Sequence, residues 1–397
     1  MTAQQIENGA QGASAGGAGL AELVKQMLAS GALTAEAIGL GGGTPSAVVV
    51  GARGSGERIT VAALATRALD SCSKNTRRTY GSYMRLLANG EPTVTGPDGN
   101  PYPGIGDLWV DEVLPSHLEA ALKVVRVRAE AGADARADRR EAKGRVVRES
   151  DGSGAGYNAI GAWRKMFTVA VNERNLAEGF NPASKVKKPA RQPGRRLALK
   201  EEHLREMLEF FGSTGDDPEL DLMIIRFILI TGARQEGVLN LRFGGLDPDE
   251  CTVRLDEKFG KVTNQPVPDW FIAELRAFAL ARGASRRKDP VFVKRLASGR
   301  FAQISRRRFN SMFGDRLQAA CPWADKAQVS AHTARHHSVT VIERATSRAV
   351  ATAFARHKPE GTNGIYTQAS PEEVAEAVVL VYGGDHPWLH RLDIDDL

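Results

Sequence analysis

Four short stretches of this sequence hold charged or polar residue types that are costly to bury, which makes them candidates for a chemical role. One holds Arg234 directly after a glycine, and a second holds Lys258 between two segments with strand-like alternation. The third is the histidine and arginine cluster at 332–337, and the fourth joins His357 to Tyr366 across nine positions. Together these types fit the cleavage of a phosphodiester, which needs a nucleophile, cations on the phosphoryl oxygens and a proton donor.

Each stretch has an ordinary explanation when it is taken alone. Arg234 could form a buried ion pair, a lysine at a hairpin tip is usually solvated, and a tyrosine is often a core anchor. His332 and His336 have the i, i+4 spacing of two zinc ligands, but the metalloprotease pattern H-E-x-x-H requires glutamate where this chain has Thr333. Arg335 inside the cluster would repel a cation. We therefore expect no metal site and no cofactor.

Taken together, six residues fill the roles of one reaction. Tyr366 would attack the phosphorus, and Arg234 and Arg335 would clamp the non-bridging oxygens, because arginine stays charged and binds two oxygens at once. Lys258 and His332 would handle the protons, and the remaining histidine would add a hydrogen bond to the phosphoryl group. The candidate catalytic residues are Arg234, Lys258, His332, Arg335, His357 and Tyr366.

The elements that position these residues are mostly helices. Apolar spacing and capping residues predict a C-terminal domain over 198–382, with strands at Thr252–Leu255 and Gln265–Val267 around the turn that holds Lys258. Its helices are expected at Lys200–Phe211, Leu220–Ile230, a short segment ending near Leu241, Asp269–Ala281, Arg306–Ala319, Ala334–Ala345 and Pro371–Tyr382. Residues 383–397 form an irregular tail.

A second, all-helical domain is predicted over residues 57–184. Its helices are expected at Ile59–Leu69, from a cap at Ser73 or Asn75, at Pro115–Ala131 and at Ala159–Asn172. The first 56 residues are rich in glycine and hold no aromatic residue, so we expect a flexible arm or a small partner-binding helix. Residues 185–197 are basic and hold prolines, which predicts an extended linker.

The composition restricts the class of protein. The chain has 397 residues, which predicts two or three domains, and 42% hydrophobic residues, which excludes disorder of the whole chain. The apolar stretch at 222–230 is far shorter than the ~20 residues that span a bilayer. Three widely spaced cysteines argue against a disulfide scaffold, so we expect a reduced, cytoplasmic protein. A net charge of +6 makes nucleic acid the first partner to consider.

Basic residues cluster at three places that would suit backbone phosphates. A charge run is usually a solvated surface, but these lie in the predicted interdomain linker or open predicted helices. The candidate DNA-binding residues are Lys74, Arg77, Arg78, Lys187, Lys188, Arg191, Arg306, Arg307 and Arg308. Binding through them would be strongly salt dependent.

The order of these motifs resembles the tyrosine recombinases, the family of phage integrases and Xer-type and Cre-type enzymes. The segment Thr231–Leu241 is similar to the family box T-G-x-R-x-x-E-(L/I)-x-x-L, and Lys258, 24 residues after Arg234, is similar to the family's hairpin lysine. His332–His336 is similar to H-x-x-R-H, and the interval from His357 to Tyr366-Thr367 is the usual one. The resemblance covers about residues 60–382.

The chain departs from the family pattern at several positions. Gly237 stands where the first box usually has glutamate, and Glu236 comes one residue early, so the carboxylate partner of Arg234 is not defined. The family sequence L-G-H-S is replaced by Ala355-Arg356-His357-Lys358, which keeps the histidine but loses the glycine turn before it. Ala233 and Ala334 stand where leucine is common, and Lys261 competes with Lys258 for the lysine role. The first 56 residues do not resemble the basic arm-binding domain of phage integrases.

The resemblance implies a two-domain, C-shaped clamp on duplex DNA, mainly α-helical with a small antiparallel sheet. It implies cleavage through a 3′-phosphotyrosyl link on Tyr366, exchange through a Holliday junction without metal or ATP, and a homotetramer of a bacterial or phage-encoded protein associated with the nucleoid. The helix at 371–382, with an apolar face, would dock on a neighbouring protomer or pack within its own chain. The need for an accessory protein stays open.

Three alternatives to a recombinase remain. A type IB topoisomerase and a telomere-resolving enzyme would use a similar tyrosine and arginine set, and a DNA-binding protein could have lost catalysis. The spacing and the segment Asn75-Thr76 with Tyr80, which resembles the family's core-binding domain, favour the recombinase. The complete set of six residues argues against lost catalysis.

Overall fold

The computed structural model describes residues 52–95, 100–147, 151–190, 198–257, 262–357 and 368–390. The chain divides into two compact units, the first including Glu149–Gln192 and everything before Ala137, and the second including Ala137–Arg148 and everything after Gln192. Each unit has its own hydrophobic core. None of the described helices is long and apolar enough to cross a membrane. The mainly helical fold class is confirmed.

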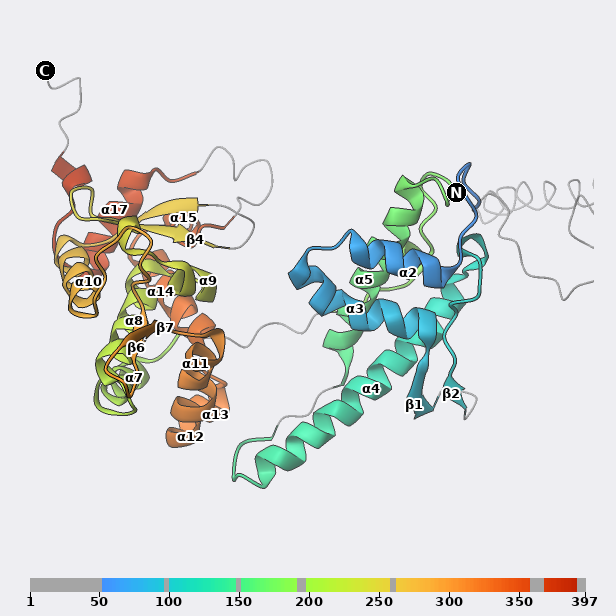
Figure 1. Cartoon of the computed structure of the whole chain (residues 1–397), viewed down its shortest axis with the longest axis horizontal. Coiled ribbons are helices and arrows are strands. Elements are labelled where there is room, and N and C mark those ends of the chain that lie inside the picture. Colours follow the sequence, from blue (N-terminus) through green and yellow to red (C-terminus); the bar gives the residue numbers. More distant parts are fainter. Residues whose placement is uncertain are drawn as a thin grey trace, which may run out of the picture. The chain divides into compact units, whose positions relative to one another are not determined.

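The first unit is a helical domain with a short hairpin (Figure 1). Thr60 and Ser73 cap its first two helices by accepting hydrogen bonds from Ala63 N and Thr76 N. Buried Trp163 donates to Tyr83 O and ties the helices together. The elements are α2 (Val61–Asp70), α3 (Lys74–Asn89), β1 (Glu91–Thr95), β2 (Pro101–Tyr102), η2 (Val110–Glu112), α4 (Pro115–Glu141), α5 (Ser153–Asn172) and α6 (Pro182–Lys185).

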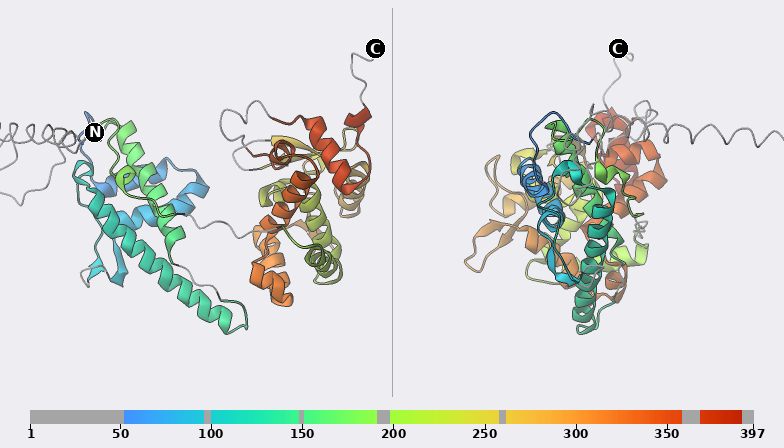
Figure 2. Two further views of the ribbon diagram at one scale, coloured as in Figure 1. Left: turned by 180° about the vertical axis from the view of Figure 1, so that it is seen from behind. Right: turned by 90° about the vertical axis from the view of Figure 1, so that its right-hand side faces the viewer.

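The helix α4 is longer than the sequence pattern indicated. Expected to end at Ala131, it continues to Glu141 and extends well beyond the helices α2, α3 and α5 (Figure 2). Its last ten residues are mostly charged or small, so they carry no apolar stripe that would reveal a packed helix. Alanine and arginine make up most of these residues and are good helix formers, and Arg140 near the end of the helix binds Asp325.

Residues 52–56 lie within the range that the sequence assigned to the arm, and they pack on the first unit. Ala52 is fully buried, and the amides of Gly54 and Gly56 donate to Asn175 O and Arg174 O. A Cβ at position 54 would lie 1.9 Å from Arg174 O, so glycine permits this close approach. The rest of the predicted arm lies outside the described residues.

The second unit holds more helices and two small antiparallel sheets (Figure 1). The helix α8 is apolar on all sides because α7 and α14 both pack against it. The described helices of the second unit are α7 (Glu201–Ser213), α8 (Pro218–Thr231), α9 (Gln235–Asn240), η3 (Phe243–Gly245), α10 (Asp269–Ala281), α11 (Arg306–Ser311), α12 (Gln318–Ala320), α13 (Pro322–Ala327), α14 (Ala331–Ala345), α15 (Arg348–Phe354), α17 (Pro371–Tyr382) and η6 (Pro387–His390).

The sheets of the second unit are short. β4 (Thr252–Asp256) pairs with β3 (Leu246–Asp247) on one side and with β5 (Val262–Pro266) on the other, in the register Asp256 to Val262. The strands β6 (Val293–Arg295) and β7 (Phe301–Gln303) form a separate hairpin. The predicted pair of strands is confirmed, whereas β3, β6 and β7 are too short to give an alternating pattern.

The predicted helix over 306–319 is wrong as a single regular helix. It breaks into α11, a π-helix over Met312–Leu317 and α12. In a regular α-helix Arg308 and Arg316 would point about 80° apart around the axis. Here both guanidinium groups bind the fully buried carboxylate of Asp221, and the wider turn between them permits this.

The apolar face of α17 packs within its own chain. Val374, Ala377 and Val378 are buried in the core of the second unit, and Tyr382 Oη donates to Leu229 O over 2.6 Å. In this single chain the helix therefore packs in cis, and docking on a neighbouring protomer stays a prediction. The opposite face carries Leu380, which is 64% exposed.

Candidate active site

Arg234 is positioned by a glycine turn at the end of α8. Gly232 has φ of +57° and caps that helix, and a Cβ on it would lie 2.8 Å from the Phe354 ring, so glycine is required here for both backbone and space. Thr231 Oγ1 accepts from Ala233 N and closes the turn. Arg234 then occupies the N-cap of α9 with extended backbone, which directs its side chain away from the helix.

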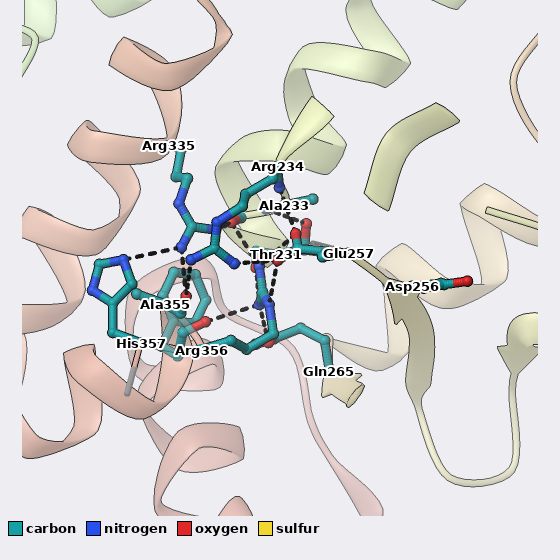
Figure 3. Close-up of polar contacts among 12 residues, drawn as sticks. Thr231, Ala233, Arg234, Asp256, Glu257, Gln265, Arg335, Ala355, Arg356 and His357 are labelled. Carbon is teal, nitrogen blue, oxygen red and sulfur yellow. Dashed lines mark hydrogen bonds and ion pairs between the residues drawn. The ribbon is translucent and has the colours of Figure 1, made fainter. Parts of the chain in front are cut away.

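Arg335 reaches the same turn from the buried face of α14. It is 2% exposed, and its guanidinium donates to Gly232 O and to Ala355 O (Figure 3). Arg234 Nη2 also donates to Ala355 O, over 3.4 Å. The two arginines thus meet at one carbonyl although 101 residues separate them in the sequence. The predicted pair is brought together.

Burial and neighbouring charge disfavour the charged form of Arg335. Removal from water lowers the pKa of its guanidinium to about 9, with Arg356 and Arg234 adding to the effect and Glu257 opposing it. A group held in this way gains most from an anion that balances its charge.

The carboxylate partner of Arg234 is Glu257, at the end of β4. Its two oxygens accept from the backbone amide of Arg234, at 2.6 Å, and from its guanidinium. Burial would raise the pKa of Glu257, but Arg356, the Arg234 amide and the Arg234 guanidinium outweigh it, so the pKa lies below its ordinary value. Glu236 binds Arg306 instead.

The two predicted histidines are both exposed but have different neighbours. His332 is exposed on the first turn of α14 and packs edge-to-face on His336 with 5.1 Å between ring centroids. His357 Nε2 lies 3.4 Å from Arg335 Nη2. Partial removal from water, followed by the charges of Arg335, Arg234, Arg356 and His336, lowers the pKa of His357 and so favours its neutral form.

A cleft of about 410 Å³ opens beside these groups. Arg234, Arg335 and His332 line one side of it, and α11, the π-helix and α12 line the other with Phe309 and Phe313. Cations at one side of a cleft with a low-dielectric wall are suited to hold an anionic group. Three of the six predicted catalytic residues therefore face one cavity.

Two of the six lie outside the described residues. Lys258 falls between Glu257 and Val262, where the description of the β4–β5 hairpin is interrupted, and Tyr366 falls between His357 and residue 368. Their roles stay predictions. The last described residue before each of these two gaps belongs to the site, since Glu257 binds Arg234 and His357 contacts Arg335.

The candidate DNA-binding residues of the first unit differ in their engagement. Lys74 and Arg78 are exposed on α3, whereas Arg77 is bound to Leu69 O and Asp70. Lys188 lies over the Tyr157 ring at 3.6 Å. Lys187 is exposed, and Arg191 lies outside the described residues.

The three arginines that open α11 also differ. Arg306 binds Gln235 and Glu236 beside the cleft. Arg308 is directed inward and holds Asp221, so its role in the structure is to anchor the π-helix. Arg307 is exposed. Arg307 is therefore the most accessible of the three to a phosphate.

Sequence reasoning missed the contribution of Glu257 and Arg356. Both were visible as departures from the family pattern, one as a carboxylate missing at Gly237 and the other as an arginine in place of a glycine. Among the described residues, no group of three or more His, Cys, Asp or Glu side chains lies together as a metal site would require.

No protein-family model matches this chain, and no curated protein matches it. Its structure is similar to the Tn1549 transposon integrase in complex with transposon right end DNA, with a TM-score of 0.53 and 15% identity, over 79% of this chain and 95% of that one. It is also similar to the same integrase in complex with a circular intermediate DNA, with a TM-score of 0.51 and 14% identity, over 79% and 95%. The chain therefore has the fold of this tyrosine recombinase, as its motifs predicted.

Proposed function

We propose that this chain is a site-specific DNA recombinase that cleaves and rejoins strands through a covalent link to Tyr366. The observation that carries the proposal is that Arg234 and Arg335 line one cleft and His357 contacts Arg335, on an integrase fold. These residues come from three distant segments, and nothing in core packing requires two arginines and a histidine at one point. A phosphate of the DNA backbone is the anion that fits them.

In this proposal each described residue has a role that its surroundings support. Arg234 and Arg335 hold the non-bridging oxygens with guanidinium forks, since both line the cleft. His357, kept neutral by burial and by the arginines, donates a hydrogen bond to the phosphoryl group. His332, exposed at the mouth of the cleft, exchanges protons with solvent.

The chemical step is a transesterification at phosphorus. Tyr366 Oη gives its proton to His332 and forms a bond to the phosphorus, the bond to the 5′ oxygen breaks, and Lys258 supplies the proton that this oxygen takes up. The 5′-hydroxyl of a partner strand then attacks the phosphotyrosyl bond and releases the tyrosine. One ester replaces another at each stage, so the exchange requires no ATP.

The partner in the proposal is double-stranded DNA. The Tn1549 integrase, which shares the fold, is in complex with transposon right end DNA and with a circular intermediate DNA. By this likeness the two units clamp a duplex, two protomers act on each site, and a tetramer exchanges strands through a Holliday junction. In this proposal Lys74, Arg78, Lys187 and Arg307, which are exposed, contact phosphates.

The test is covalent trapping on nicked suicide DNA taken from the region around the gene. Wild type is expected to give an adduct that survives a denaturing gel, and Tyr366→Phe is expected to bind the DNA without forming one. Tyr102→Phe is the matched control, because the buried Tyr102 hydroxyl has no hydrogen-bond partner in the described structure. It should form the adduct at the wild-type rate.

Other outcomes would contradict the proposal in distinguishable ways. Tight, salt-sensitive binding without an adduct in any variant would indicate a DNA-binding protein. An adduct followed by relaxation of supercoiled DNA, with no exchange between two duplexes, would indicate a topoisomerase-like reaction.

A further inference from the structure

Arg356 occupies a backbone position that favours glycine. Its φ is +54°, in the left-handed region, where a side chain other than that of Gly, Asn or Asp is strained. The family pattern has glycine immediately before the catalytic histidine, so this chain accepts strain next to His357. Strain of this kind persists where the surrounding contacts determine the conformation.

Those contacts come from the Arg356 guanidinium, whose side chain is 4% exposed. It donates to Thr231 O and Phe354 O, each over 2.9 Å, and to Gly232 O over 2.7 Å. It also donates to the side-chain oxygen of Gln265 on β5 and lies 3.3 Å from a Glu257 oxygen. One side chain thus joins the glycine turn, the β4–β5 hairpin and the segment that bears His357 (Figure 3).

The acceptors of Arg356 are shared with the proposed phosphate clamp. Gly232 O accepts from both Arg356 and Arg335, and the Glu257 carboxylate accepts from both Arg356 and Arg234. A displacement of Arg356 would therefore change the position of both clamp arginines. Reacting groups need to be held within a fraction of an ångström of productive geometry.

The position of Glu257 explains the other departure from the family pattern. A Cβ at Gly237 would lie 3.1 Å from Glu257 Oε1 and 3.3 Å from Glu257 Cγ. The space beside α9 is therefore filled by a carboxylate that comes from β4. Gly237, Glu257 and Arg356 form one arrangement.

We infer that Glu257 and Arg356 form a buried pair of positioning residues that holds Arg234, Arg335 and His357 in register for the phosphate. The inference rests on the proposed function, because it assumes that this phosphate is what the two arginines bind. Neither residue needs to touch the DNA. Glu257 also offsets part of the charge of three neighbouring guanidinium groups.

The charge of Arg356 can be followed at His357 without any DNA. His357 is surrounded by Arg335 and His336 on α14, Arg234 at the start of α9 and Arg356 on its own segment, and these lower its pKa after burial. Replacing Arg356 by methionine keeps an unbranched aliphatic side chain, shorter than that of arginine, and removes the charge and its hydrogen bonds. The pKa of His357 should then rise toward its ordinary value of 6.5.

The experiment measures three quantities in wild type, Arg356→Met and Arg356→Lys. They are the pKa of His357 by NMR, with the resonance assigned through His357→Gln, the rate of adduct formation on suicide DNA, and the dissociation constant for that DNA. Arg282→Met is the matched control, because Arg282 is also buried and ion-paired in the second unit but contacts Asp217 and Glu219 instead.

Arg356→Met should raise the His357 pKa and slow adduct formation about 10- to 100-fold, with the dissociation constant unchanged. Arg356→Lys should leave the pKa at its wild-type value and recover part of the rate. Arg282→Met should lower the thermal midpoint alone. If Arg356→Met does not fold, a slowed Arg356→Lys supports the inference and a wild-type rate overturns it.

Two further results decide the matter. Arg356→Met with wild-type rate and wild-type His357 pKa, or with a lowered thermal midpoint as its only change, overturns the inference. If wild type forms no adduct, but Arg356→Met raises the His357 pKa and Arg356→Lys does not, the pair is present and the proposed function is at fault.

Discussion

Arg282 and Arg335 are both buried arginines of the second unit, and their surroundings are opposite. Arg282 is 7% exposed and donates to Asp217, Glu219 and Val293 O, and these carboxylates raise its pKa against the effect of burial. Arg335 is 2% exposed, and among the described residues its guanidinium donates to two backbone carbonyls. Burial and two other arginines lower its pKa to about 9.

The difference distinguishes an arginine whose charge the protein itself neutralises from one whose charge it balances only in part. The chain itself neutralises Arg282, so its ion pairs join α8, α10 and β6. The charge of Arg335 is offset only in part by Glu257, which binds Arg234 and Arg356 directly. Stability favours a neutralised charge, and a site that retains an excess positive charge gives up stability for binding.

The largest expected effect is the loss of cleavage in Arg335→Met. Removing one preformed donor from a phosphoryl group typically slows the reaction about 10²- to 10³-fold. Gly232 O and Ala355 O keep their bonds from Arg356 and Arg234, so the free energy of unfolding should be unchanged or higher than in wild type. Adduct formation and urea denaturation measure the two quantities, and a strongly destabilised variant would contradict the comparison.

Arg282→Met should lower the free energy of unfolding and leave the rate of cleavage unchanged. It leaves Asp217 without its buried partner, and breaking a pair of this kind costs about 3 kcal/mol of unfolding free energy. The rate of adduct formation per folded molecule should equal that of wild type. A slowed reaction at a temperature where the variant is folded would show that Arg282 is coupled to the site.

A smaller effect is expected when the carboxylate of the site is moved. Glu257→Ala should slow adduct formation about 10- to 100-fold, because Arg234 loses its acceptor. Adding Gly237→Glu places a carboxylate on α9 in the space that Glu257 leaves, and the backbone there accepts a side chain. The double variant should recover part of the rate. Failure to recover any would mean that the bond to Arg356 matters more than the one to Arg234.

Much of the fold was predictable because the second unit carries long apolar patterns. The helices α8, α10 and α17 follow their predicted ranges closely, since each buries apolar residues along its length, and Asp217 and Ser370 cap α8 and α17. The break at the π-helix was not predictable, because it depends on Asp221, which lies 87 residues before Arg308. A carboxylate buried at such a distance leaves no local signal.

The site was predictable in its residues and not in its connections. Arg234, His332, Arg335 and His357 follow from type and spacing. In the sequence alone, the missing carboxylate at Gly237 and the missing glycine at position 356 are two separate departures from the family pattern. The structure joins them, because Glu257 fills the space beside Gly237 and binds the guanidinium that replaced the glycine.

An anion should stabilise the protein through Arg335. With inorganic phosphate at about ten times its dissociation constant, the unfolding free energy of wild type should rise by about 1.4 kcal/mol. Arg335→Met should gain much less, whereas Arg282→Met should gain as much as wild type because its site is intact. Thermal denaturation with and without phosphate measures this. An equal gain in all three proteins would place the anion elsewhere.

The smallest effect is a pH dependence of stability that originates at His357. Its folded pKa lies below the unfolded value of 6.5, so between the two values the unfolded state binds more protons and stability falls as the pH is lowered. Because the ring is partly exposed, solvent screening limits the loss to about half a kcal/mol or less. His337 also has a lowered pKa and acts in the same direction, so the comparison is between wild type and His357→Gln. Urea denaturation at pH 7.5 and 5.5 should show the smaller loss in His357→Gln, and equal losses would mean that the three arginines do not reach the ring.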